Sequence, residues 1–450
     1  MKTRSLLLVV LSLSLIPMSL SAWDTRLTGL GGPSLAIGQE LPSALLAVGL
    51  FPTDQFNVGL SAIPDPVDIF TLPQQLGNEK MFPSNALIAE WTGTTTGSGG
   101  LVMKPKGPMT FAIFLMRPGN NGFVIGAPRG AFPALGTFVT DSTVTVTAPT
   151  APSNIFDFIF SYKLGNVLLG GSAGFAYGLA ANINESTSGT ANSNVTDTSS
   201  TWAATGRLGA SMPLGPVGFD AGVVVVVGNA SAKQVTGAMP PVPYGANLND
   251  SLTATNVALS VNARALLPLG DKLDFAGVGN FSMLPQNYSA SNAAGAITNS
   301  TALIDPSGIW SAGTGAGITW KPSDAFTIIG YLSAIVGAGN WVNVIGASPS
   351  STLWVTVKPL LSGELKPATW LTIRGGVSYA GIYNTTTLNV NAGGTASTTV
   401  TWTTGATVNA GCSIQVTDKA LLEMVINLTN FTAAAGLATP FIQTSLKMDL

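Results

Sequence analysis

The chain of 450 residues contains no histidine and a single cysteine. Without histidine it lacks the usual general base of Ser–His and Cys–His hydrolases, and it has no imidazole ligand for a metal ion. Cys412 alone cannot form an internal disulfide or a zinc cluster. The acidic residues are too scattered to suggest the paired carboxylates of a glycosidase. We therefore expect a protein that is not an enzyme and that uses no cofactor.

Charged side chains are also scarce, at 9% of the residues, and the formal net charge is −2. Neither nucleic acid nor an anionic surface is therefore expected as a partner. In contrast, 46% of the residues are hydrophobic and the mean hydropathy is +0.40, which is high for a secreted soluble protein. The chain must hence bury or cover a large apolar surface.

Long apolar runs are missing from all but the first residues. A positive start at Lys2 and Arg4, an apolar stretch at 6–16 and small residues up to Ala22 predict a secretory signal peptide at 1–22. We expect cleavage near Ala22; an uncleaved anchor is the alternative. Downstream, no run approaches the ~20 apolar residues that a membrane-spanning helix needs.

What the chain does contain is a repeated alternation of apolar and polar residues. Between Thr201 and Met212, Trp202 and Leu208 share the even positions, whereas Arg207 lies on the odd ones. A period of two predicts β-strands whose faces meet different environments. About a dozen such segments predict an all-β fold, a transmembrane antiparallel up-and-down β-barrel of about 14–16 strands. A soluble β-solenoid rich in threonine and asparagine is the main alternative fold.

Tight turns and long polar loops alternate between the predicted strands. Pro268-Leu269-Gly270-Asp271 is typical of the turns, and loops rich in Asn, Ser, Thr and Gly are predicted near 180–199, 229–250, 285–305, 337–350 and 384–398. In outer-membrane barrels the short turns face the periplasm and the long loops face outside. Three weaker strands are predicted at 85–92, 100–104 and 108–116, followed by a loop at 118–152 that lies outside the barrel or folds inward. The barrel then covers residues 85–450.

Most charges in the strands share the polar phase. Since a lysine or arginine facing lipid at the midplane costs ~2–4 kcal/mol, this phase should face the lumen. The predicted lumen-lining residues are Asp157, Lys163, Arg207, Asp220, Arg264, Asp274, Lys321, Lys358, Glu364, Arg374 and Glu423. Their spacing suggests cross-strand pairs between Arg207 and Asp220 and between Arg264 and Asp274. Because acidic and basic residues are nearly equal in number, we expect them to make the lumen rigid rather than to form an ion-selective constriction.

Aromatic residues lie mainly on the opposite phase. Trp202, Trp310 and Trp402 start their predicted strands and should mark the outer rim, whereas Tyr162 and Trp320 end strands at the periplasmic rim. Such rings belong at the level of the lipid headgroups. Trp354 is the exception because it lies on the inward phase, where it either contacts a ligand or packs against a plug.

Residues 23–84 show little alternation and many prolines, including Pro64, Pro66 and Pro73. The segment is long enough to fill the barrel as a plug. A loosely ordered periplasmic tail is an equally weighted interpretation.

Both ends of the mature chain resemble known outer-membrane proteins. Ile442, Thr444, Leu446, Met448 and Leu450 alternate with polar residues, which resembles the C-terminal strand that the barrel-assembly machinery recognises, except that Leu450 replaces the usual aromatic. The Gly-rich segment 24–32 resembles the opening of FadL-like and PorV-like proteins. The stretch 70–76 stands where those families have Asn-Pro-Ala but lacks the asparagine. The resemblance implies a 14-strand barrel with an N-terminal hatch that admits hydrophobic molecules.

These features predict a bacterial outer-membrane barrel that lets small solutes cross passively, in the manner of a porin. The expected partners are outer-membrane lipid, the barrel-assembly machinery through the C-terminal strand, and the small solutes themselves. A FadL-like transporter of hydrophobic compounds is one alternative. A surface-structural protein without transport is the other.

Overall fold

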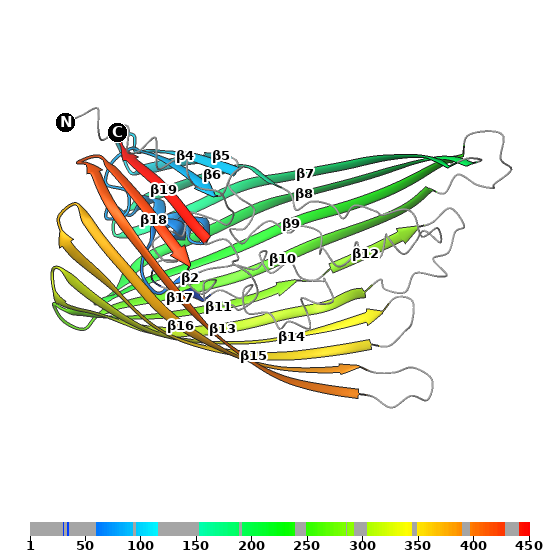
Figure 1. Cartoon of the computed structure of the whole chain (residues 1–450). Helices are drawn as coiled ribbons and strands as arrows, with labels where there is room; N and C mark the ends of the chain where they lie inside the picture. Colours follow the sequence, from blue (N-terminus) through cyan, green and yellow to red (C-terminus); the bar gives the residue numbers. More distant parts are fainter. Residues whose placement is uncertain are drawn as a thin grey trace.

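The computed structural model describes residues 30, 34–35, 60–92, 96–115, 153–188, 191–238, 249–284, 286–291, 304–343, 349–388, 397–427 and 441–450. The predicted signal peptide at 1–22 and the predicted loop at 118–152 lie outside these residues. Within them, the strands form a closed antiparallel barrel in chain order, and the last strand pairs with the first (Figure 1). β11 and β12 both pair with β10 and count as one strand, so the described residues form a 16-strand barrel. The predicted fold class is confirmed, and the 14 strands implied by the family resemblance are corrected to 16.

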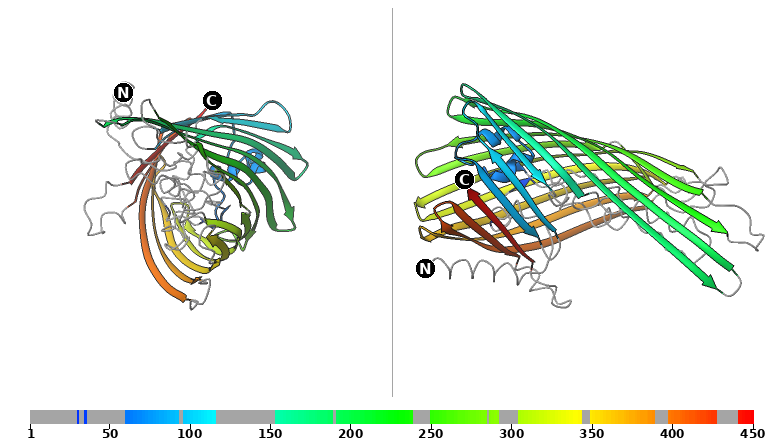
Figure 2. Two further views of the ribbon diagram at one scale, coloured as in Figure 1. Left: turned by 90° about the vertical axis from the view of Figure 1, so that its right-hand side faces the viewer. Right: turned by 90° about the horizontal axis from the view of Figure 1, so that it is seen from above.

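The strands differ greatly in length. Those of the wall are β3 (Ala86–Thr92), β4 (Thr96–Met103), β5 (Met109–Leu115), β6 (Ser153–Leu164), β7 (Val167–Ser188), β8 (Ala191–Leu214), β9 (Val217–Ala238), β10 (Asn249–Pro268), β11 (Leu273–Leu284), β12 (Gln286–Ser291), β13 (Ile304–Ser323), β14 (Phe326–Asn343), β15 (Pro349–Ala368), β16 (Leu371–Leu388), β17 (Ser397–Thr417), β18 (Ala420–Asn427) and β19 (Phe441–Asp449). β8 has 24 residues, whereas β3 has 7 and β19 has 9. Among the described residues, the strands are therefore short in β3 to β5, β18 and β19 and longer from β6 to β17 (Figure 2).

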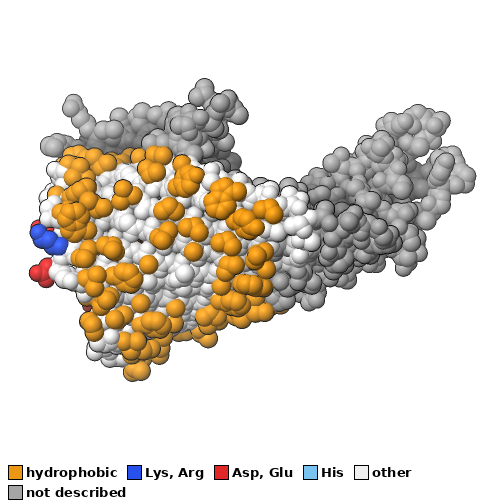
Figure 3. All heavy atoms as spheres, turned by 90° about the horizontal axis from the view of Figure 1, so that it is seen from below, with side chains coloured by type: hydrophobic (Ala, Val, Ile, Leu, Met, Phe, Trp, Pro, Cys, Tyr) orange, Lys and Arg blue, Asp and Glu red, His pale blue; other side chains and the backbone are white. Residues whose placement is uncertain are grey.

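The two faces of the wall follow the predicted alternation. On β6, Phe158 is 40% exposed, whereas its neighbour Asp157 is 1% exposed. On the side seen in Figure 3, hydrophobic side chains are spread over the outer face of the described strands, and the charged side chains in view lie at one end. The closed wall with an apolar exterior excludes the β-solenoid alternative.

The tight turns that the structure describes, such as those between β6 and β7 and between β8 and β9, lie at the end of the barrel that holds the C-terminus (Figure 1). Gly165 and Gly215 have φ of 60° and 64°, a left-handed conformation that glycine adopts without steric cost.

All five loop predictions at the opposite end include residues that the structure places in strands. β12 lies within 285–305, and β14 continues to Asn343 within 337–350. β7 continues to Ser188, β8 begins at Ala191, β9 continues to Ala238 and β16 to Leu388. A strand that has left the lipid can carry polar residues on both faces, so its alternation disappears while its backbone pairing continues.

No helix in the described part of the chain is long and apolar enough to cross a membrane. The residues before β3 form two short 3-10 helices, η2 (Pro66–Phe70) and η3 (Pro73–Gly77), and a small sheet of β1 (Ser34–Leu35) with β2 (Leu60–Ser61). The 3-10 helices lie within the ring of strands, near the end with the tight turns (Figures 1 and 2).

Candidate functional site

The residues predicted to line the lumen form ion-pair clusters on the face opposite the exposed apolar side chains. Arg207 Nη1 lies 3.0 Å from Asp157 Oδ1 and also donates to Ser172 Oγ. The predicted pair of Arg207 with Asp220 is wrong, because the register between β8 and β9 places Ser211 opposite Asp220. Arg207 instead reaches β6 across β7, which the spacing along the chain did not reveal.

The second predicted pair, Arg264 with Asp274, is also wrong. Arg264 lies directly opposite Asp220 in the register of β10 and β9, and their side chains are 2.8 Å apart. The same guanidinium lies 2.5 Å from Asp68 of η2. Asp274 pairs with Lys321 at 2.6 Å near the turns, where both are about half exposed.

A third cluster lies on the wall formed by β15 to β18. Arg374 is 2.8 Å from Glu364 and 3.1 Å from Glu423, and Ser413 donates to Glu423. Lys163 pairs with Glu79 at 3.0 Å at the exposed rim. Lys358 is half-buried on β15.

The segment that contains η2 and η3 is shaped by proline and aspartate. Pro66 and Pro73 begin the two helices, where a missing N–H has no cost. Asp65 accepts a hydrogen bond from the Val67 N–H, and the Asp68 carboxylate accepts one from the Asp65 N–H. This capping box holds the Asp68 carboxylate at the start of η2, where it also reaches Arg264.

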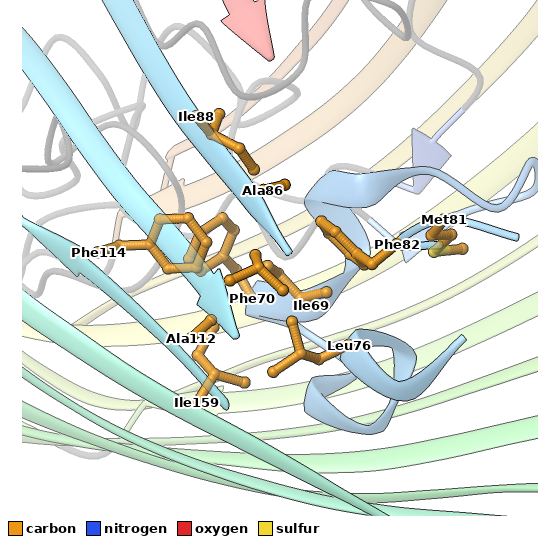
Figure 4. Close-up of a cluster of buried hydrophobic side chains, with 11 residues drawn as sticks. Ile69, Phe70, Leu76, Met81, Phe82, Ala86, Ile88, Ala112, Phe114 and Ile159 are labelled. Atoms are coloured by element: carbon orange, nitrogen blue, oxygen red, sulfur yellow. The ribbon is translucent and has the colours of Figure 1, made fainter. Parts of the chain in front are cut away.

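An apolar cluster fixes this segment to one part of the wall. Ile69, Phe70, Leu76 and Phe82 pack against inward side chains of β3 to β6 (Figure 4). The rings of Phe70 and Phe114 meet edge to face with centroids 5.1 Å apart.

Glycines on the next strands let the segment approach the wall closely. A Cβ at Gly170 of β7 would lie 2.1 Å from the Gln74 backbone nitrogen, and one at Gly209 of β8 would lie 1.9 Å from Gln74 Oε1. A Cβ at Gly222 of β9 would lie 3.1 Å from the Thr71 carbonyl oxygen. Only glycine leaves the space for a second backbone here.

Side-chain hydrogen bonds complete the attachment. Gln74 Nε2 donates to the carbonyl oxygens of Ala210 and Ala221 at 3.1 and 3.2 Å. Gln75 Nε2 donates to Ser211 and, at 2.8 Å, to Asp220. Asp220 therefore joins β9, β10 and η3 in one network. Sequence reasoning missed both glutamines, because a lone Gln-Gln dipeptide carries no recognisable signal.

The pKa values of Asp68 and Glu79 are shifted in opposite directions. Burial raises the pKa of Asp68 above its ordinary value, although the charge of Arg264 and its hydrogen bond act in the opposite direction. At the exposed rim, the hydrogen bond and the charge of Lys163 lower the pKa of Glu79.

The segment does not fill the space between it and the wall from β10 to β15. A cavity of about 760 Å³ lies between residues 62–64 and the ends of β10, β11 and β13 to β15. Its apolar lining includes Leu266, Phe275 and Ile329. Its charged lining is balanced, with the cations Lys80, Lys321 and Lys366 and the anions Asp274, Asp324 and Glu364.

Farther from the turns, the inner wall is polar and aromatic. Asn280 donates to Asn262 and Ser260. Trp354 is buried, and its ring covers Gly337, where a Cβ would lie 2.2 Å from the indole. It therefore packs against the wall itself. Within the described residues no cluster of acids or cysteine suits a metal ion.

The predicted rim aromatics all point outward, with exposures between 36% for Trp202 and 65% for Trp402. The expectation that Trp202, Trp310 and Trp402 start their strands is wrong. β8 begins at Ala191, β13 at Ile304 and β17 at Ser397, so each strand continues outward beyond its tryptophan.

Comparisons with known proteins give distant structural matches only. No family model matches the chain, and no curated protein matches it. Among solved structures, the chain is similar to the Pseudomonas putida toluene transporter TodX, with 11% identity, 96% of this chain and 97% of that chain covered, and a TM-score of 0.39. The CymD monoaromatic hydrocarbon channel matches with 11% identity, coverage of 96% and 98%, and a TM-score of 0.36. CdiB from Escherichia coli matches with 12% identity, coverage of 81% and 62%, and a TM-score of 0.39.

The chain is an outer-membrane-type β-barrel. Its described strands form a closed 16-strand wall with an apolar outer face, as such barrels do. At such TM-scores the functions of the matched proteins carry no argument for this chain.

Proposed function

We propose that this protein lies in the outer membrane and lets small solutes cross passively through a barrel that residues 60–84 plug at the periplasmic end. The observation that carries the proposal is the attachment of η2 and η3 inside a wall whose outer face is apolar. The ion pairs at Arg207, Arg264 and Arg374 lie on the inner face, as expected for a lumen that holds water rather than lipid.

The outward aromatics support the membrane position. Trp310 and Trp320 lie on the same face of β13, and ten residues separate them along the strand. At ~3.3 Å per residue and a tilt of about 40°, they mark levels roughly 25 Å apart. That distance matches the apolar band of an outer-membrane barrel, with the tight turns on the periplasmic side.

A transporter of hydrophobic compounds is the second candidate. The apolar part of the cavity lining, with Leu266, Phe275 and Ile329, favours it. A surface-structural role is the third candidate.

Conductance across planar bilayers separates these candidates. We would compare the mature protein with a variant that lacks residues 23–84, after heat-modifiable migration on a gel has shown that both form barrels. Rare openings before deletion and a larger conductance after it support the plugged barrel that passes small solutes. Conductance only after deletion favours a plugged carrier of hydrophobic compounds. A large, constant conductance of the intact protein contradicts the plug, and no conductance in either protein favours the structural role.

Assembly by the barrel-assembly machinery is part of the same proposal. β19 pairs along its length with both β18 and β3, so it closes the wall. Cell fractionation of a variant lacking the last residues of β19 tests whether insertion depends on this strand.

A further inference from the structure

The cavity of about 760 Å³ between the plug and the wall from β10 to β15 has an apolar interior and a charged mouth. Apart from Glu364, its buried side chains are all apolar: Ala62 of the plug, Ala276 of β11 and Ile329 of β14. The mouth lies at the end of the barrel with the tight turns, since Asp324 of the turn between β13 and β14 lines the cavity and is exposed. The volume falls within the range of small-molecule sites.

Half of the charged groups in the lining already have a partner of opposite charge. Asp274 and Lys321 pair with each other at 2.6 Å. Glu364 pairs with Arg374 at 2.8 Å. These three lining groups therefore need no counter-ion from a ligand.

The other three charged groups of the lining are free to meet a ligand. Lys80, Asp324 and Lys366 are exposed, and within the described residues their side chains take part in no ion pair or hydrogen bond. Asp324 and Lys366 are close along the backbone, because the Lys366 N–H donates to the carbonyl oxygen of Ala325. Lys80 reaches the cavity from the plug. The mouth thus offers unpaired charges of both signs next to an apolar interior.

We propose that this cavity binds small zwitterions with an apolar body, the chemistry of an apolar amino acid. The carboxylate of the solute meets Lys80 and Lys366, and its ammonium group meets Asp324. Its side chain packs on Ala276 and Ile329. A solute with a single charge leaves groups of one sign at the mouth without a partner, and that difference discriminates against it. The proposal rests on the proposed transport function and names the class of solute held at its periplasmic mouth.

Titrations of the mature protein in detergent, followed by saturation-transfer NMR, measure binding without transport, with protein-free micelles as the blank. L-Leucine is compared with isocaproate, which lacks the ammonium group, with isoamylamine, which lacks the carboxylate, and with glycine, which lacks the apolar side chain. Because a transported solute must also leave its site, we expect a dissociation constant for leucine of about millimolar size. Each analogue should bind about fivefold more weakly than leucine, as the loss of one partly exposed contact implies.

Charge variants assign the two ends of the ligand. In Asp324→Asn the preference for leucine over isocaproate should disappear, because the ammonium group loses its partner. In Lys80→Met with Lys366→Met the preference for leucine over isoamylamine should disappear. A purely structural role of these residues would instead weaken leucine and its analogues alike. The matched control, Asp418→Asn with Lys419→Met, lies in the turn between β17 and β18 outside the cavity lining and should keep both preferences.

The outcomes separate the site from the transport function. Leucine that binds no more tightly than the single-charge analogues, or preferences that survive the variants, overturns the zwitterion site. Swelling of proteoliposomes in leucine measures transport independently. Swelling above protein-free liposomes without saturable binding refutes the site alone, whereas saturable binding without swelling supports the site and refutes the transport function.

Discussion

Replacing Arg264 with leucine should release the plug. Arg264 is fully buried and holds Asp68 of η2 and Asp220 of β9 at the same time. In Arg264→Leu both carboxylates lose their counter-ion while they stay buried. A docked plug then places two acids near each other in a site of low polarity, which opposes docking.

The size of the effect follows from the geometry. Removing one partner of a buried ion pair costs about 3–5 kcal/mol. Asp220 remains in the wall whether or not the plug is docked, so only part of this cost opposes docking. Since about 1.4 kcal/mol corresponds to a factor of ten, we expect the open fraction to rise at least ~10-fold.

Single-channel recording in planar bilayers measures the open fraction directly. The matched control is Arg374→Leu, which also leaves two acids, Glu364 and Glu423, without their arginine but lies in the wall away from η2 and η3. It should lower barrel stability without raising the open fraction. The triple variant Arg264→Leu, Asp68→Asn and Asp220→Asn should return the open fraction towards that of the parent. Equal opening in Arg264→Leu and Arg374→Leu would refute the reasoning.

Three further predictions follow from single features of the structure. The pKa of Asp68 is raised in the docked plug, so docking takes up a proton; docking should strengthen as the pH falls towards the ordinary value of 3.8 and weaken as it rises through the raised pKa. Channel recordings across this range test the trend, which Asp68→Asn should abolish. Gly170→Ala places a methyl group 2.1 Å from the Gln74 nitrogen and should raise the open fraction, whereas Gly206→Ala, with nothing within 4 Å, should leave it unchanged in the same recordings. Phe158→Arg puts a charge on the lipid-facing side of β6 and should lower barrel stability by ~2–4 kcal/mol in urea unfolding from lipid vesicles; an unchanged midpoint would contradict the assignment of that face.

The strand faces and the turns were largely predictable from the sequence. The period of two on β6 and β8 predicted which side chains face outward, because lipid and a polar interior impose opposite demands on neighbouring residues. Pro268-Leu269-Gly270-Asp271 predicted a turn because glycine supplies a backbone conformation that other residues avoid. Strand ends beyond the lipid were not predictable, since nothing there forces apolar and polar residues to alternate.

The ion pairs were not predictable from spacing. Which acid meets Arg207 or Arg264 depends on the stagger between neighbouring strands, and in a closed barrel that stagger is set by all the strands together. The sequence by itself therefore determined the class of wall, its two faces and the side on which the charges lie. Only the tertiary structure decided the charge partners, the seating of Gln74 and Gln75 between the glycines, and the cavity on one side of the plug. These contacts join residues between 44 and 196 positions apart, and no local pattern records them.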